Sequence, residues 1–292
     1  MKTILALTDF SANAANAIRN AVALANLISG KLILVHILPL EVMTTAESGV
    51  YTSFDPVVHE HYATKLNDIA KEIQLENGFR FEVEVFCEHG PFNEVVNALV
   101  ISSKADLVVM GYRGTNSFLD KVIGSTTAAY MRMAACPVLA VPSASRLWGF
   151  SKIAYASDFT GHDQVYLQQL FRLTEPFKTQ VFIINVKTKK KAASDAEDRI
   201  LQDMAKAFPN SRYCITQVKA DSIPAGIMAF ISDNKVNVLA VSLHERSLLE
   251  DFFHKSVSKE LALETTVPLL SLPEKPYNLR NHQTEGTETI AG

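Results

Sequence analysis

The residues with the clearest chemical potential form a glycine-marked segment that follows the apolar run 107–110. Its glycines and hydroxyl residues are Gly111, Gly114, Gly124, Ser125 and Thr126. Glycines let the backbone turn tightly and bring its N–H groups close to a ligand. A hydroxyl pair at a helix start adds free amides and the positive end of the helix dipole, which together suit a phosphate. On the glycines alone, an ordinary surface loop is the simpler interpretation. Evidence for a phosphate-binding loop therefore has to come from the rest of the chain.

A second group that could contact a ligand is Asp9, which follows the apolar strand expected at 3–8. In an open parallel sheet, ligands bind beyond the carboxyl ends of the strands, where the strand order reverses. If the strands 3–8 and 107–110 are neighbours, Asp9 and Gly111 converge on one crevice. Asp9 can also serve simply to cap the following helix together with Ser11. The glycine segment matches neither the GxxxxGK[ST] nor the GxGxxG phosphate-binding pattern.

The elements that would position these residues alternate between strands and helices. Apolar runs predict strands at 3–8, 32–38, 81–86, 107–110 and 137–142. Periodicity and helix-start signals predict helices at about 11–30, 57–76, 91–102 and 125–134. The resulting βαβαβαβαβ order predicts a mostly parallel sheet with right-handed crossovers. The connection 39–56 is long for such a fold, which suggests a lid that folds Tyr51 or Phe54 near the ligand or between the two halves.

The same pattern begins again in the second half of the chain. Asp158-Phe159-Thr160 repeats Asp9-Phe10-Ser11 at a separation of 149 residues. The matching strands are expected at 153–157, 181–186, 212–218, 236–241 and 267–273. This duplication predicts two domains, at 1–143 and 151–274, joined by a short linker. The polar tail 275–292 lacks periodicity and is expected to be disordered or loosely attached.

Composition and charge exclude several classes of function. The 292 residues are 48% hydrophobic and 20% charged, as in an ordinary globular protein. The formal net charge of −3 gives no case for binding to nucleic acid or to a membrane surface. No apolar run reaches the roughly 18–20 residues of a membrane span, and the first apolar run is shorter than a secretory signal. Three scattered cysteines without a CxxC pattern favour a reducing cytoplasm over a disulfide framework.

The glycine segment and the start of the chain together resemble a known family. Gly111-x2-Gly114-x9-Gly124-Ser125 resembles the nucleotide-binding signature of the universal stress protein (UspA-like) family, spacing included. The opening Thr8-Asp9-Phe10-Ser11 and the pair His36-Ile37 after the second strand are also similar to that family. The resemblance covers residues 1–142 strongly and 151–273 as a degraded second copy. It implies an α/β fold of two tandem Rossmann-like (adenine nucleotide alpha hydrolase-like) domains. Each would be a five-stranded, mostly parallel sheet in the order 3-2-1-4-5, with helices on both faces.

The resemblance also implies that the first half binds ATP or a related adenine nucleotide. Asp9 and Ile37 would contact the adenine or its surroundings, and Thr8 stands where the family often has proline. Met110 and Gly111 would flank the ribose and the phosphates. The residues along the phosphates would be Arg113, Gly114, Gly124, Ser125 and Thr126. Magnesium would be held largely through the phosphates, because no carboxylate cluster here resembles a metal cage.

Several of these residues have simpler interpretations. Arg113 is equally typical of a solvated loop charge. Ser125 and Thr126 can be ordinary helix N-caps, which use the same amides that bind phosphate. His36 fits a structural histidine at a strand end better than a catalyst. Neither Cys87 nor the histidines of His59-Glu60-His61, which point to different faces of a helix, predict a metal site.

The second copy lacks the phosphate-binding glycines. The residues at the three glycine positions are Ser242, Glu245 and Lys255, whereas the hydroxyl is kept as Ser256. Glu245 adds negative charge where a phosphate would lie. We therefore expect one nucleotide per chain, in the first half, and a second half that packs against the first as a partner subunit would. Two chains could also form a homodimer through their fifth strands.

These observations favour a cytoplasmic sensor or regulator of the stress response over an enzyme. No catalytic triad, carboxylate dyad or metal motif is present in the sequence, so at most weak ATP hydrolysis is expected. A slow ATPase or phosphotransferase is one alternative, and a nucleotide-independent interaction scaffold is another. The protein partner is not named by the sequence.

Overall fold

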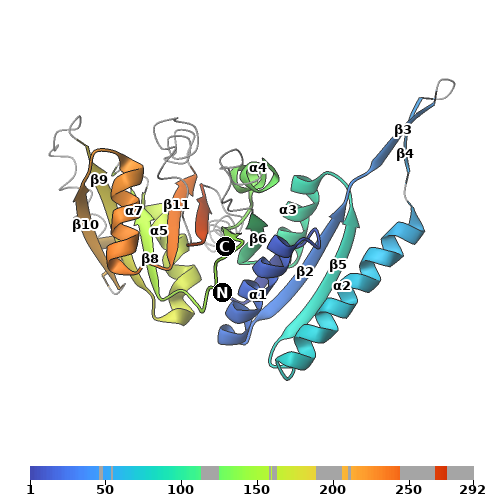
Figure 1. The fold of residues 1–292 in the computed structure, drawn as a ribbon, viewed down its shortest axis with the longest axis horizontal. Coiled ribbons are helices and arrows are strands. Elements are labelled where there is room, and N and C mark those ends of the chain that lie inside the picture. The colour runs from blue at the N-terminus through green and yellow to red at the C-terminus, as the bar shows by residue number, and fades with distance from the viewer. Residues whose placement is uncertain are drawn as a thin grey trace, which may run out of the picture.

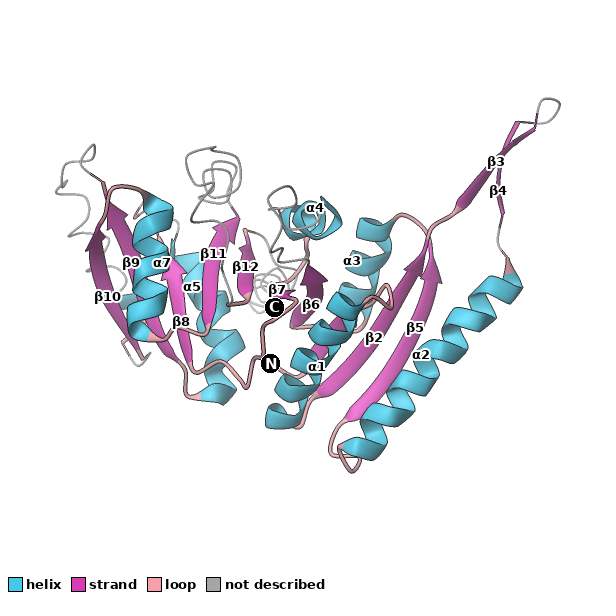
Figure 2. Cartoon of the chain, viewed as in Figure 1, coloured by secondary structure: helices cyan, strands magenta, loops and turns pink. Residues whose placement is uncertain are grey.

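The computed structural model describes residues 1–45, 49–53, 55–112, 125–157, 159, 163–188, 206–209, 212–243 and 267–274. Within these residues, ten strands form one sheet in the order β10-β9-β8-β11-β12-β7-β6-β1-β2-β5, and β3 and β4 form a separate pair. Helices cover both faces of the large sheet (Figures 1 and 2). The predicted α/β class with a mostly parallel sheet is confirmed.

The first half supplies five neighbouring strands of the sheet, all parallel to one another. In spatial order they are β5 (Glu82–His89), β2 (Lys31–Leu38), β1 (Thr3–Leu7), β6 (Leu107–Tyr112) and β7 (Val138–Pro142). The helices between them are α1 (Ala12–Ile28), α2 (Pro56–Glu76), α3 (Phe92–Ser102) and α4 (Ser125–Met133). The expected strand order 3-2-1-4-5 is therefore confirmed for this half.

The second half repeats the arrangement. Its strands, again in spatial order, are β10 (Tyr213–Lys219), β9 (Gln180–Lys187), β8 (Lys152–Ala156), β11 (Val238–Leu243) and β12 (Leu269–Pro273). Its described helical elements are α5 (Asp163–Thr174), the 3-10 turn η1 (Glu175–Phe177) and α7 (Ile223–Asn234). The order 3-2-1-4-5 is thus confirmed here as well.

The two halves meet edge to edge through their fifth strands. β12 pairs antiparallel with β7, with Leu270 opposite Leu139, and both side chains are fully buried. The pairing joins the five predicted strands of each half into one ten-stranded sheet. An unpaired β7 would expose a row of backbone N–H and C=O groups, which the pairing satisfies. Among the described residues, β7 and β12 each have a neighbouring strand on both sides, so a homodimer through these strands, which stays a prediction, would require this junction to open.

Two apolar cores, one on each face, extend across both halves of the sheet. One contains residues of α1, α2 and α5, together with Leu139 of β7 and Leu270 of β12. The other contains residues of α3, α4 and α7, together with Val138 of β7 and Leu269 of β12. Strands buried on both faces need continuous apolar runs, which is why these segments lack the alternation of a half-exposed strand.

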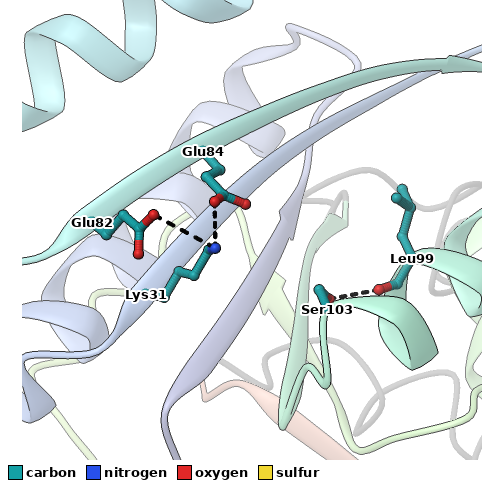
Figure 3. Close-up of polar contacts among 5 residues, drawn as sticks. All are labelled: Lys31, Glu82, Glu84, Leu99 and Ser103. Carbon is teal, nitrogen blue, oxygen red and sulfur yellow. Dashed lines mark hydrogen bonds and ion pairs between the residues drawn. The ribbon is translucent and has the colours of Figure 1, made fainter.

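Polar side chains link β2 to β5 and close the end of α3 (Figure 3). The ammonium group of Lys31 at the start of β2 lies between Glu82 and Glu84 of β5, 3.6 Å from Glu82 Oε1 and hydrogen-bonded to Glu84. The hydrogen bond with Glu84 raises the pKa of Lys31 above its ordinary value. At the end of α3, the Ser103 hydroxyl donates to the Leu99 carbonyl oxygen at 2.6 Å and so closes the last turn.

The long connection after β2 contains a hairpin that the sequence did not predict. β3 (Glu41–Thr45) and β4 (Gly49–Ser53) pair antiparallel, with Met43 opposite Tyr51. Figure 1 shows the hairpin extending away from the large sheet, beyond the first turn of α2. Phe54 lies outside the described residues, and the structure does not describe the side chain of Tyr51. The lid that would fold one of these residues near the ligand therefore stays a prediction.

Candidate functional site

The strand order reverses at the carboxyl end of β1. From β1, the chain passes through α1 to β2 on one side, whereas β6 lies on the other side. This is the point at which strand order reverses, where open α/β sheets bind ligands. Asp9 follows β1 and Gly111 lies near the end of β6, so the two predicted residues lie at the carboxyl ends of neighbouring parallel strands.

The turn between β1 and α1 is held by three hydrogen bonds from backbone N–H groups to side chains. The Thr8 hydroxyl oxygen accepts from Phe10 N at 2.9 Å, and Asp9 Oδ1 accepts from Ser11 N at 2.9 Å. Ser11 Oγ accepts from Ala14 N at 3.2 Å, which makes Ser11 the N-cap of α1, as predicted. Phe10 adopts a positive φ of 62°. Asp9 therefore shapes the turn that precedes the helix, and Ser11 alone caps it.

Asp9 carries a negative charge at the mouth of the crevice. Burial raises the pKa of its carboxyl group, but the hydrogen bonds from Ser11 and the charge of protonated His36 outweigh that effect, so the pKa lies below its ordinary value. An ionised carboxylate only accepts hydrogen bonds, and it repels other anions. Asp9 thus suits a ligand hydroxyl or amino group and disfavours a phosphate beside it.

Behind Asp9 lies a small aromatic cluster centred on His36. The carbonyl oxygen of Thr8 accepts from His36 Nδ1 at 2.8 Å, so Nδ1 carries the proton. His36 is buried, and its Nε2 has no hydrogen-bond partner among the described residues. Burial lowers the pKa of His36. The rings of Phe10 and Tyr62 each lie 4.7 Å from the imidazole, which fits the predicted structural role of this histidine.

The predicted adenine contact Ile37 belongs to the opposite face of the sheet. His36 and Ile37 are consecutive residues of β2, so their side chains point to opposite faces. Ile37 is half-buried against the core that α3 and α4 cover. The structure thus separates the side chains of this pair, and only His36 joins the cluster at the Thr8–Ser11 turn.

Gly111 lies inside β6, although the sequence places it just beyond the strand. The parallel pairing of β6 with β7 extends through Gly111 and Tyr112, opposite Val141 and Pro142. A Cβ atom on Gly111 would lie 2.5 Å from the carbonyl oxygen of Asn13, in the first turn of α1. The glycine therefore permits α1 to approach the strand closely, whether or not a ligand is bound.

The remaining predicted phosphate contacts are only partly described. Arg113, Gly114 and Gly124 lie outside the described residues, as does the side chain of Ser125, which begins α4. Thr126 is exposed on the first turn of α4. Met110, predicted to flank the ribose, is 5% exposed and packs in the core.

Sequence reasoning missed three residues that shape the site. Thr127 is buried, and its hydroxyl lies 3.5 Å from the carbonyl oxygen of Gly111. Tyr62 belongs to the His36 cluster, and Asn13 contacts the position of Gly111. Only the adjacent hydroxyl run Ser125-Thr126-Thr127 carried a signal, because the other two contacts join segments that are distant in sequence.

Two histidines that are distant in sequence, His59 of α2 and His89 of β5, lie close together in the fold. His59 Nδ1 lies 3.1 Å from His89 Nε2, and the Cys87 sulfur lies 4.0 Å from the His59 carbonyl oxygen. Burial raises the pKa of Cys87, which favours the neutral thiol over the metal-binding thiolate. Across the part of the chain that the structure describes, no three His, Cys, Asp or Glu side chains are arranged to hold a metal ion.

The equivalent region of the second half contains a buried, hydrogen-bonded carboxylate. Asp163 is 4% exposed and accepts hydrogen bonds from the hydroxyls of Tyr155 at 2.7 Å and Ser157 at 2.8 Å. With the repeat offset of 149 residues, Tyr155 and Asp163 stand where the first half has Ala6 and Ala14. The second half therefore places a buried carboxylate where the first half has methyl groups.

Comparisons with known proteins agree with the fold. The model of the universal stress protein family matches residues 1–142. A relative named as a universal stress protein in Staphylococcus aureus (strain USA300) is 30% identical over 141 residues, which are 48% of this chain and 83% of that protein.

Solved structures extend the similarity to both halves. A universal stress protein from Archaeoglobus fulgidus has a TM-score of 0.64 at 15% identity, covering 93% of this chain and 98% of its own. A second structure, named as a universal stress protein from Pseudomonas aeruginosa UCBPP-PA14, has a TM-score of 0.59 at 15% identity. The match covers 98% of this chain and 97% of that chain. At this identity the two structures show the fold alone. No helix in the described part of the chain has the length and apolar character needed to cross a membrane.

Proposed function

The chain belongs to the universal stress protein family, and from that premise we propose that it binds ATP in its first half and regulates a stress response. The observation that carries the proposal is that the Thr8–Ser11 turn, the start of α1 and Gly111 lie together at the carboxyl ends of β1 and β6, where strand order reverses. The Asp9 carboxylate offers an acceptor for ligand hydroxyl or amino groups, and the N-terminus of α4 offers donors for an anion. A nucleotide presents both kinds of group.

In this proposal, Asp9 accepts a hydrogen bond from the ribose or the adenine, because its charge disfavours a neighbouring phosphate. Ile37 and Met110 provide apolar surroundings for the base and the sugar, and Thr8 holds the turn. The phosphates extend toward the start of α4, where the proposed contacts are Arg113, Gly114, Gly124, Ser125 and Thr126. Magnesium, if bound, is held through the phosphate oxygens.

We further propose that the chain comprises two tandem domains, 1–143 and 151–274, followed by a polar tail at 275–292. The repeated strand order and the single β7–β12 junction support this division. In that arrangement the second domain acts as an internal partner for the first, so the chain resembles a dimer within one polypeptide. The three cysteines are free, in keeping with a cytoplasmic location.

The second half is proposed to bind no nucleotide. The Asp163 carboxylate, held by Tyr155 and Ser157, lies buried where the first half has Ala14. A phosphate beside this carboxylate would meet like charge in a site shielded from solvent. The loss of the three glycines in this half supports the same conclusion.

Isothermal titration with magnesium-ATP tests the proposal. We expect a stoichiometry near one per chain, and we expect Gly124→Asp to abolish binding because a carboxylate would then face the phosphates. Lys255→Asp changes the corresponding position of the second half and is expected to leave binding intact. A stoichiometry near two, or binding that survives Gly124→Asp, contradicts the proposal. A single-turnover assay with labelled ATP then distinguishes a regulator, which keeps its ATP, from a slow ATPase.

A further inference from the structure

A pocket lies between α1 and the linker that joins β7 to β8, away from the Thr8–Ser11 turn. Its volume is about 270 Å³, and its walls include Arg19 and Ala23 of α1 and Arg146 and Trp148 of the linker. Ligand pockets usually measure about 300–1,000 Å³, so this space suits a molecule with a single ring. It shares no residue with the proposed nucleotide site.

The linker wall of the pocket is fixed in place by two buried asparagines of α1. Asn16 Nδ2 donates to the Ser145 carbonyl oxygen at 2.9 Å, and Asn20 Oδ1 accepts from Leu147 N at 2.6 Å. Leu147 points inward and is 3% exposed, whereas its neighbours Arg146 and Trp148 are exposed. The anchoring therefore holds both of these side chains outward along the rim.

The pocket presents positive charge and an open aromatic face. Arg19 donates to Asn16 Oδ1 at 3.2 Å, which orients its guanidinium group. Within the described residues, none of the ion pairs involves Arg19 or Arg146, and no carboxylate lines the space. Trp148, the one tryptophan of the chain, is 80% exposed, although tryptophan is usually well buried. Exposed tryptophan beside arginine is typical of binding surfaces.

From this juxtaposition we propose that the pocket binds a small organic anion that carries one aromatic ring. The ring stacks on the indole of Trp148, and the carboxylate or phosphate of the ligand accepts hydrogen bonds from the guanidinium groups of Arg19 and Arg146. Because the pocket flanks the linker between the two halves of the sheet, a bound ligand would contact α1 and the linker together.

Trp148 makes the test direct, because its fluorescence reports on this pocket alone. Benzoate and phenyl phosphate are expected to change the indole emission saturably. Acetate lacks the ring and benzamide lacks the charge, so each should bind about 10-fold more weakly or not at all, as expected for one lost charged or stacking contact. If neither aromatic anion produces a saturable change, or if benzamide matches benzoate, the proposal is wrong.

Three arginine variants complete the test. Arg146→Gln and Arg19→Gln should each weaken benzoate binding about 10-fold. Arg172→Gln, on the exposed surface of α5, is the matched control and should leave binding unchanged. Thermal unfolding verifies that the variants fold, since exposed substitutions rarely change stability. Benzoate affinity that stays the same in both pocket variants overturns the assignment. Arg146→Gln should bind magnesium-ATP as tightly as the unmodified chain does. A negative result for the aromatic anions therefore does not bear on the proposed nucleotide site.

Discussion

Replacing Gly111 with alanine tests whether the close packing of α1 on β6 builds the crevice. The new Cβ would lie 2.5 Å from Asn13 O, 2.6 Å from Asn13 C and 2.9 Å from Ala14 N. All three atoms belong to the backbone, so no side chain can rotate away. Real Cβ atoms essentially never approach within 3.0 Å, so α1 and β6 must separate by at least 0.5 Å, the difference between 3.0 and 2.5 Å.

The expected cost follows from this displacement. Overpacking a tight contact destabilises a protein by about 1–3 kcal/mol, and occasionally by more. Gly78→Ala is the matched control, because Gly78 has a positive φ of 59° and nothing within 4 Å of an added Cβ. Its cost comes only from the left-handed backbone conformation, about 1 kcal/mol. The two variants therefore separate a steric effect at the site from a conformational effect far from it.

Urea unfolding gives the free-energy change, and hydrogen exchange at the amide of Ala14 locates it. In Gly111→Ala, the first turn of α1 shifts, so the bond from Ala14 N to Ser11 Oγ weakens and exchange accelerates. In Gly78→Ala, the exchange rate at the Ala14 amide should change only as much as the change in global stability predicts. The reasoning fails if Gly111→Ala unfolds within about 0.5 kcal/mol of the unmodified chain, a change no larger than that of a neutral surface substitution.

Three further predictions concern pH, the linker and the sheet edge. Burial lowers the pKa of His36 in the folded chain, so the unfolded chain binds more protons, and stability is lost as the pH falls below the ordinary pKa of 6.5. Urea midpoints measured as the pH is lowered should therefore fall less steeply in His36→Asn than in the unmodified chain. Equal slopes in the two proteins would contradict the burial argument. Asn20→Ala leaves the buried N–H of Leu147 unpaired and should cost about 1–3 kcal/mol in urea unfolding, and an unchanged urea midpoint would contradict this role. Lys31→Gln removes the partly exposed ion pair with Glu84 and should cost at most about 1 kcal/mol, a loss that shrinks in high salt; a salt-independent loss would rule out an electrostatic origin.

Apart from the β3–β4 hairpin, the sequence alone was sufficient for the order of the described elements and for the local turn at the site. Apolar runs separated by helical periodicity predicted the α/β class, and Ser11 was identified as a helix cap because capping uses residues within one turn. The strand order came from the family resemblance, not from the pattern. The end of β6 was placed two residues early, because Gly111 and Tyr112 pair with β7 through contacts that no local pattern records.

Tertiary structure decided which distant segments meet. The chemistry of the crevice was predicted through Asp9 and Gly111, but the aromatic cluster around His36 and the contact of Gly111 with Asn13 join residues far apart in the chain. The antiparallel junction of β7 and β12 was likewise decided by which strand edges match. Periodicity in a sequence records which side of each element is buried, because that depends on a repeat within the element. The identity of the neighbour depends on shape and edge pairing between elements, and only the folded chain sets that.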